Sequence, residues 1–180
     1  MLAPALVFAQ AEPAEVTYDR KKYENAMVEL KSAATETDRF YALNDAAKTS
    51  LSQGHDADAK SFAEELEKLT PKYKGDWNYG NAIQDFNLVL GRLALKAGEV
   101  ENAKKRLLAA GRSPGSPQMN TFGPNMTLAR DLLAKGEKEV VLAYFDLCKN
   151  FWKMEDGRLA KWRQDIAADR SPDFGANLIY

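Results

Sequence analysis

Residues 82–110 read AIQDFNLVLGRLALKAGEVENAKKRLLAA, and they carry the clearest evidence for the fold of this chain. Apolar residues recur every three or four positions on both sides of Gly98, which is the spacing of two amphipathic helices. A glycine between two helices supplies the positive φ that ends the first helix without a clash of its Cβ atom. The stretch therefore predicts a hairpin of two helices that turns at Gly98.

The same arrangement occurs around two further glycines, Gly54 and Gly136. Each of the three glycines has a leucine three residues before it, alanine or glycine seven residues before it, and alanine or valine five residues after it. These residues are Leu51, Leu95, Leu133, Ala47, Gly91, Ala129, Ala59, Ala103 and Val141. We therefore expect the helix hairpin to be used three times.

The expected fold class is all-α, because β-branched residues are few and no segment keeps the alternation of a strand. The expected helices cover residues 18–34, 40–53, 57–69, 82–97, 100–110, 126–135, 138–152 and 155–169. Residues 70–80 and 111–125 are rich in glycine, proline and asparagine, which predicts two long connections. These connections and the end segment 170–180 combine exposed backbone with aromatic residues, so binding chemistry is expected there.

The composition excludes several classes of function. The 25 basic and 26 acidic residues nearly balance, which argues against a nucleic-acid partner. Cys148 is the single cysteine and is predicted to be a buried structural thiol. His55 is the single histidine and stands in the turn after Gly54, so a multi-histidine metal site cannot form and a histidine-based catalytic triad is not expected. We expect no enzyme activity, no metal and no cofactor.

The first eleven residues, MLAPALVFAQA, are treated apart from one predicted domain at 12–180. An apolar run followed by Ala-Gln-Ala resembles the end of a signal peptide, and it is too short to span a bilayer. This pattern predicts a truncated leader and an exported protein, periplasmic or secreted. The alternative is a cytoplasmic protein whose apolar N-terminus packs on the first helix.

The repeated residues resemble the tetratricopeptide repeat over about residues 40–152. The second hairpin shows the family spacing best, with Leu90-Gly91, Ala94-Leu95, Gly98, Ala103, Leu107 and Ala110. The spacings of 44 and 38 residues between the glycines exceed the period of about 34 residues that the family uses. The resemblance implies an α-α superhelix of about three hairpins, with extra helices at both ends and a concave face that binds proteins or peptides.

Basic residues occupy one position of the repeat, six residues before each glycine: Lys48, Arg92 and Arg130. Lys96 lies one turn after Arg92, and Asn44 lies one turn before Lys48. A ladder of this kind on the concave face could bind the carboxylates of an acidic peptide. The alternative is a solvated helix face whose cations pair with nearby carboxylates such as those of Asp45 and Asp85.

Arg112 and Trp77 complete the expected site at its rim. An exposed tryptophan is a common anchor for a partner, although Trp77 could instead fold back over the groove between two hairpins. The function we expect is a non-catalytic adaptor that binds a protein or peptide. The alternatives are a self-associating or envelope-scaffold protein, and a protein whose long loops bind a small anion or a saccharide.

Overall fold

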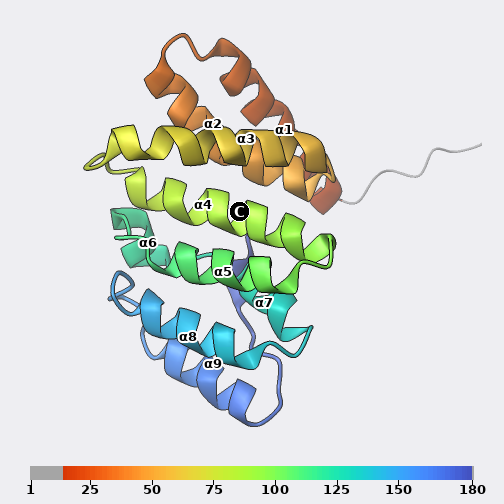
Figure 1. The fold of residues 1–180 in the computed structure, drawn as a ribbon, viewed down its shortest axis with the longest axis vertical. Coiled ribbons are helices and arrows are strands. Elements are labelled where there is room, and N and C mark those ends of the chain that lie inside the picture. The colour runs from red at the N-terminus through yellow and green to blue at the C-terminus, as the bar shows by residue number, and fades with distance from the viewer. Residues whose placement is uncertain (1–13, 180) are drawn as a thin grey trace, which may run out of the picture.

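The computed structural model describes residues 14–179, and all regular structure in this range is helical (Figure 1). The all-α prediction is thereby confirmed. The leader proposed for residues 1–11 lies outside the described residues. The bounds of the α-helices are α1 Ala14–Ser32, α2 Glu36–Ser52, α3 Asp56–Leu69, α4 Tyr79–Lys96, α5 Val100–Gly111, α6 Pro117–Phe122, α7 Thr127–Leu133, α8 Lys138–Cys148 and α9 Arg158–Ala167. Two short 3-10 helices follow α3 and α9, at Thr70–Tyr73 and Gly175–Leu178.

The three expected hairpins are α2–α3, α4–α5 and α7–α8. Figure 1 shows α1 to α5 stacked in chain order and followed by α8 and α9, with α6 and α7 toward opposite ends of α5. The turns contain Gly54, Gly98 and Gly136 with φ of 78°, 81° and 84°, which confirms the sequence prediction. In each turn the glycine N–H donates to the carbonyl three residues back, and the next N–H donates to the carbonyl five residues back. Both bonds satisfy carbonyls at the end of a helix, and they require the left-handed conformation of the glycine.

Small residues let the helices approach one another, as the repeat predicted. Ala59, Ala103 and Ala129 have no exposed surface, and Gly91 is buried on α4. A Cβ atom added at Gly91 would lie 2.4 Å from Cδ2 of Leu128 on α7. Glycine at this position therefore permits the second and third hairpins to pack closely.

Several helix boundaries differ from those expected. Helix α2 begins four residues earlier than predicted, because Thr35 caps it by accepting a hydrogen bond from the Asp38 N–H. Residues 117–122, predicted to lie within a loop, form the short helix α6. Ser116 accepts a hydrogen bond from Met119 N, and Pro117 occupies the first turn, where its missing N–H leaves no bond unmade. The loop prediction for this segment was wrong.

The core of the last hairpin and α9 is aromatic, as expected. Phe151, Trp152 and Trp162 are buried, and the rings of Trp152 and Trp162 lie 5.7 Å apart. Cys148 is fully buried among them, and this burial raises the pKa of its thiol well above the ordinary value. A buried thiol with a raised pKa is a poor nucleophile, consistent with the structural role predicted for Cys148.

The end segment runs back along the stack, from α9 to the level of α4 (Figure 1). The indole N–H of Trp162 donates to the carbonyl of Asp173 at 2.9 Å, and the ring of Phe174 is buried against Trp162. Farther on, Met126 N donates to the carbonyl of Asn177 at 2.7 Å. These contacts bring residues 176–179 beside the start of α7, where they form part of the site described below.

Within residues 14–179, none of the helices has both the length and the apolar character needed to cross a membrane.

Candidate functional site

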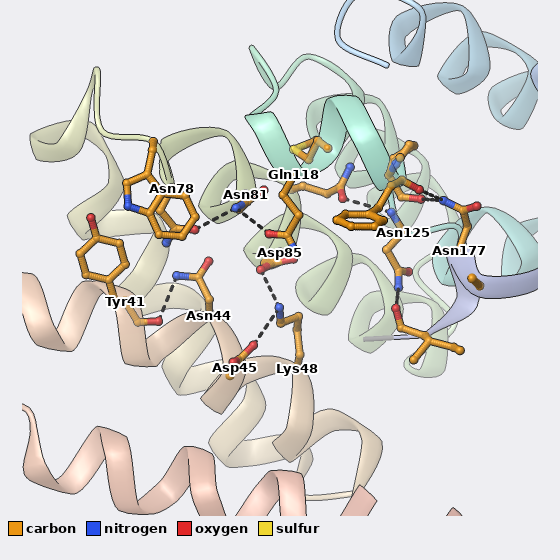
Figure 2. A pocket seen from close by; sticks show the side chains of 18 residues that line it. Tyr41, Asn44, Asp45, Lys48, Asn78, Asn81, Asp85, Gln118, Asn125 and Asn177 are labelled. Atoms are coloured by element: carbon orange, nitrogen blue, oxygen red, sulfur yellow. Dashed lines mark hydrogen bonds and ion pairs between the residues drawn. The ribbon is translucent and has the colours of Figure 1, made fainter. Parts of the chain in front are cut away.

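A cavity of about 330 Å³ lies where α2, the start of α4, the segment around α6 and the end segment meet (Figure 2). Its volume lies at the lower end of the range usual for ligand pockets. Seven carboxamide side chains line it: Asn44, Asn78, Asn81, Gln84, Gln118, Asn125 and Asn177. We refer to this cavity as the amide pocket.

Asn81 connects two walls of the amide pocket. Its Nδ2 donates to Oδ1 of Asn78 at 3.1 Å and to Oε1 of Gln118 at 3.2 Å (Figure 2). Its Oδ1 accepts from Ser116 Oγ at 2.7 Å. Asn81 thus ties the start of α4 to α6. The hydroxyl of Ser113 strengthens the same junction by donating to the carbonyl of Gly80 at 2.7 Å.

The back of the pocket is a closed hydrogen-bond network. Gln84 accepts from the Asn125 N–H at 3.1 Å, and Tyr144 donates to the Asn125 carbonyl at 3.2 Å. The Asn125 side-chain oxygen accepts from both the N–H and the hydroxyl of Thr127, at 2.9 and 2.6 Å. Buried amides that are satisfied in this way fix the shape of the pocket and leave little capacity for a ligand.

Asn44 differs from the amides at the back of the pocket. Its Nδ2 donates to the carbonyls of Phe40 and Tyr41 at 3.0 and 3.3 Å, whereas its Oδ1 has no hydrogen-bond partner (Figure 2). The residue is only 6% exposed. An unsatisfied buried acceptor costs about 1 to 3 kcal/mol, which a ligand that donates a hydrogen bond could recover.

Lys48 lies between two carboxylates on the floor of the pocket. Its Nζ is 3.0 Å from Oδ1 of Asp45 and 3.0 Å from Oδ2 of Asp85 (Figure 2). Burial alone would lower the pKa of Lys48, but the two carboxylates outweigh it and hold the pKa above its ordinary value. Burial raises the pKa of Asp85, and Lys48 offsets part of this rise. The cation of Lys48 is therefore neutralised within the protein.

The rim of the amide pocket is apolar. Trp77, Phe122 and Ile179 are 59%, 70% and 68% exposed, and they are half of the exposed large apolar residues in the part of the chain that the structure describes. Trp77 stacks on Tyr41 with ring centroids 5.7 Å apart. The Tyr41 hydroxyl donates to Asp76 at 2.7 Å and so holds the loop that carries Trp77. Exposed aromatic residues around a polar cavity are typical anchors for a partner.

The structure brings together three of the residues predicted to bind a partner, since Asn44, Lys48 and Trp77 all line the amide pocket. Trp77 both packs on Tyr41 and keeps most of its surface exposed, so the two interpretations of this residue each describe part of its environment.

The other predicted residues lie elsewhere. Arg92 and Arg130 both pair with Asp131 on α7, at 2.9 and 3.0 Å, and Lys96 pairs with Asp56. Arg112 is exposed at the end of α5 and does not line the amide pocket. The cations of the proposed ladder have carboxylate partners, as in the alternative interpretation of that helix face. A role for these four residues in binding stays a prediction.

Sequence reasoning missed most of the amide residues. Asn78, Gln118 and Asn177 lie in the two long connections and the end segment, where binding chemistry was expected, but no residue pattern marked them as one set. The amides of α4 had no signal, because asparagine and glutamine on a helix usually face solvent. In the described part of the chain, three side chains able to hold a metal ion do not come together anywhere.

Replacing Asn177 by alanine is expected to lower the free energy of unfolding by about 2 kcal/mol. Its Nδ2 donates to the carbonyls of Phe122 and Pro124 at 3.0 and 2.9 Å, and both would lose this partner, the second in a buried position. Urea unfolding followed by circular dichroism measures the change. Asn150→Ala, an exposed position on the surface, should change the free energy by less than about 0.5 kcal/mol. Equal losses of unfolding free energy in the two variants would contradict the conclusion that the bonds of Asn177 hold the end segment in place.

Comparison of the sequence with known protein families found no match, and neither curated proteins nor solved structures gave a similar protein. The resemblance to tetratricopeptide repeats rests on the residues quoted for it.

Proposed function

We propose that this protein is a non-catalytic adaptor that binds an extended peptide segment of a partner protein in the amide pocket. The observation that carries the proposal is the convergence of seven carboxamides on one cavity rimmed by three exposed apolar side chains. The carboxamides at the back of the pocket are satisfied within the protein and fix its shape. An exposed carboxamide at its mouth, such as that of Gln118, can donate to the C=O and accept from the N–H of a peptide group. The apolar rim can take up side chains of the same peptide.

Trp77 is the rim residue best suited to test this proposal. Peptides would be selected from a random display library on the wild-type protein, and their affinities measured by fluorescence anisotropy. Trp77→Ala should weaken binding at least about tenfold, equivalent to about 1.4 kcal/mol, because the variant lacks the aromatic ring that the bound peptide would cover.

Tyr18→Ala is the matched control for Trp77→Ala. Tyr18 is 58% exposed, close to the 59% of Trp77, but it lies on α1 and does not line the amide pocket. Its loss should leave the affinities unchanged within about twofold. Peptides that bind both variants as well as the wild type would place the binding surface away from the pocket and contradict the proposal.

A saccharide is a second candidate ligand for the same pocket. The long connections do form two of its walls, and the exposed face of the Trp77 ring lies beside amide groups that can bond hydroxyls. A glycan array decides between the two ligands. A glycan whose binding depends on Trp77, together with a failure to select peptides, would favour the saccharide.

Self-association is the structural alternative, and the exposed rim could serve it as well. Sedimentation velocity at several protein concentrations tests it, because self-association must depend on concentration. A dimer that dissociates in Trp77→Ala but not in Tyr18→Ala would assign the rim to contacts between copies of the chain. A protein that stays monomeric at all concentrations would contradict self-association and keep the apolar rim available to a partner peptide.

A further inference from the structure

We infer that the amide pocket, together with the hollow beside it, receives a basic side chain, a lysine or an arginine, of the bound peptide. The inference rests on the proposed function and adds the chemistry of the partner. Three independent features of the molecule carry it: an unpaired acceptor, an excess of carboxylates and an exposed aromatic ring.

The unpaired acceptor is Oδ1 of Asn44. Both donated bonds of this side chain go to carbonyls of its own helix, which fixes the amide orientation and leaves the oxygen without a donor. Asn44 lines the pocket beside Asp45, and Figure 2 shows its oxygen turned away from Tyr41. A ligand that supplies N–H donors would satisfy this oxygen, whereas a carboxylate, which only accepts, would not.

The carboxylates extend beyond the amide pocket. A second hollow between α1 and α2 is lined by Glu29, Asp38 and Asp45, and it shares Asp45 and Tyr41 with the amide pocket. The hydrogen bond from Thr35 keeps the pKa of Asp38 below its ordinary value, so this carboxyl is charged at neutral pH. The hollow and the pocket thus adjoin at Tyr41 and Asp45, and we refer to the two together as the acidic surface.

The acidic surface has a net negative charge. The residues that line the two hollows include four carboxylates, those of Glu29, Asp38, Asp45 and Asp85, and one ammonium, that of Lys48. Lys48 is already held by Asp45 and Asp85, and the side chain of Asp45 is still 64% exposed. Asp45 can therefore accept a second donor from a ligand, while an acidic peptide would meet net repulsion.

Trp77 supplies the third feature. Its ring stacks on Tyr41 with the planes 22° apart, and more than half of its surface stays exposed at the rim. Tryptophan gives the strongest attraction of the aromatic residues to a cation placed over its face. A guanidinium or ammonium group entering beside Trp77 would lie next to the hollow that contains Asp45.

The test uses N-acetyl-arginine amide and its uncharged isostere N-acetyl-citrulline amide, titrated to millimolar concentration into ¹⁵N-labelled protein. The arginine probe should shift the signals of the Asn44 side chain and the Trp77 indole with at least about fivefold higher affinity than the citrulline probe. Raising sodium chloride from 50 to 500 mM should weaken the arginine shifts, because salt screens exposed charges.

Asp45→Asn should reduce the affinity of the arginine probe at least about fivefold. Asp146→Asn is the matched control, because Asp146 is also exposed, at 59%, and also pairs with a lysine three residues later. Asp146 lines neither of the two hollows, so this control should leave the arginine affinity unchanged.

Three outcomes separate this inference from the proposed function. Selective arginine shifts that are lost in Asp45→Asn support it. Equal shifts by arginine and citrulline, or arginine shifts that survive Asp45→Asn, overturn it and leave peptide binding through the amides intact. No shift in the pocket by either probe also overturns it, whereas the proposed function is judged separately by the selected peptides and Trp77→Ala.

Discussion

Replacing Lys48 by methionine is expected to lower the free energy of unfolding by about 3 to 5 kcal/mol at pH 7. The Asp85 side chain is 11% exposed, and Lys48 is its ion-pair partner at 3.0 Å. Methionine fills a similar volume but leaves the buried carboxylate without a counter-ion and beside the like charge of Asp45. Urea unfolding followed by circular dichroism measures the loss.

Two further variants show whether the buried charge causes this loss. Lys48→Met combined with Asp85→Asn removes both charges and should recover most of the lost free energy, because exchanging a whole buried pair is often nearly neutral. Lys149→Met breaks a surface ion pair between Lys149 and Asp146, whose side chains are 55% and 59% exposed. This variant should lower the free energy of unfolding by less than about 1 kcal/mol. A double variant as unstable as Lys48→Met would show that packing, and not charge, is responsible.

The pH dependence of Lys48→Met follows from the same carboxyl. Burial raises the pKa of Asp85 in the folded protein, and without Lys48 this pKa must rise further. A group whose pKa is raised by folding favours the folded state below its unfolded pKa, and this contribution is lost as the pH rises through the folded pKa. The difference in free energy of unfolding between the wild type and Lys48→Met should therefore become smaller as the pH is lowered from 7 to 5.

Replacing Gly80 by alanine is expected to cost about 3 kcal/mol, although alanine normally stabilises a helix relative to glycine by about 0.5 to 1 kcal/mol. Gly80 lies in the first turn of α4, and an added Cβ atom would stand 1.9 Å from the carbonyl oxygen of Gly115. That contact is with backbone, so the segment after α5 must move away. Urea unfolding measures the loss, and the selected peptides should also bind more weakly because the wall that contains Gln118 shifts.

Gly98→Ala serves as the control for Gly80→Ala. A Cβ atom at Gly98 meets nothing within 4 Å, and the cost there comes from a φ of 81° alone, about 1 to 2 kcal/mol. Gly98 does not line the amide pocket, so peptide affinity should be unchanged. A Gly80→Ala protein more stable than the wild type would contradict the close approach of α4 and the segment that follows α5.

The variants at Lys48, Trp77 and Asp45 separate effects on stability from effects on binding. Lys48 was predicted from the repeat as a cation that binds an acidic partner, a role that stays untested. In the structure Lys48 is the counter-ion of Asp85, so its replacement tests the fold before it tests binding. Trp77 and Asp45 are exposed, and their variants report on binding with little change in packing.

The helices and turns of the fold could be predicted from the sequence because their signals are local. A glycine at a fixed place in an apolar period of three to four residues determines where a helix ends, whatever surrounds it. The start of α2 and the helix α6, which the predictions missed, also have local signals. Thr35 and Ser116-Pro117 are capping residues, which the period of apolar residues does not reveal. The burial of Cys148, Phe151 and Trp162 followed from the same periodicity.

The amide pocket could not be predicted, because its walls are far apart in the chain. Asn81 and Gln118 are 37 residues apart, and Asn125 and Ile179 are 54 apart, yet each pair is joined by a hydrogen bond. The return of the end segment depends on the burial of Phe174 against Trp162, and no local pattern encodes that contact. The ion pairs of the predicted ladder likewise depend on which helix faces lie side by side.

The all-α fold, its three helix hairpins and the buried thiol follow from the amino-acid sequence alone, because helix periodicity and positive-φ glycines act over a few residues. Tertiary structure alone decided where polar groups gather. It placed seven amides and an apolar rim around one cavity, and it enclosed Lys48 between two carboxylates. Hydrogen bonds and ion pairs act over a few ångströms in space, and the chain brings these groups that close only when its hairpins pack.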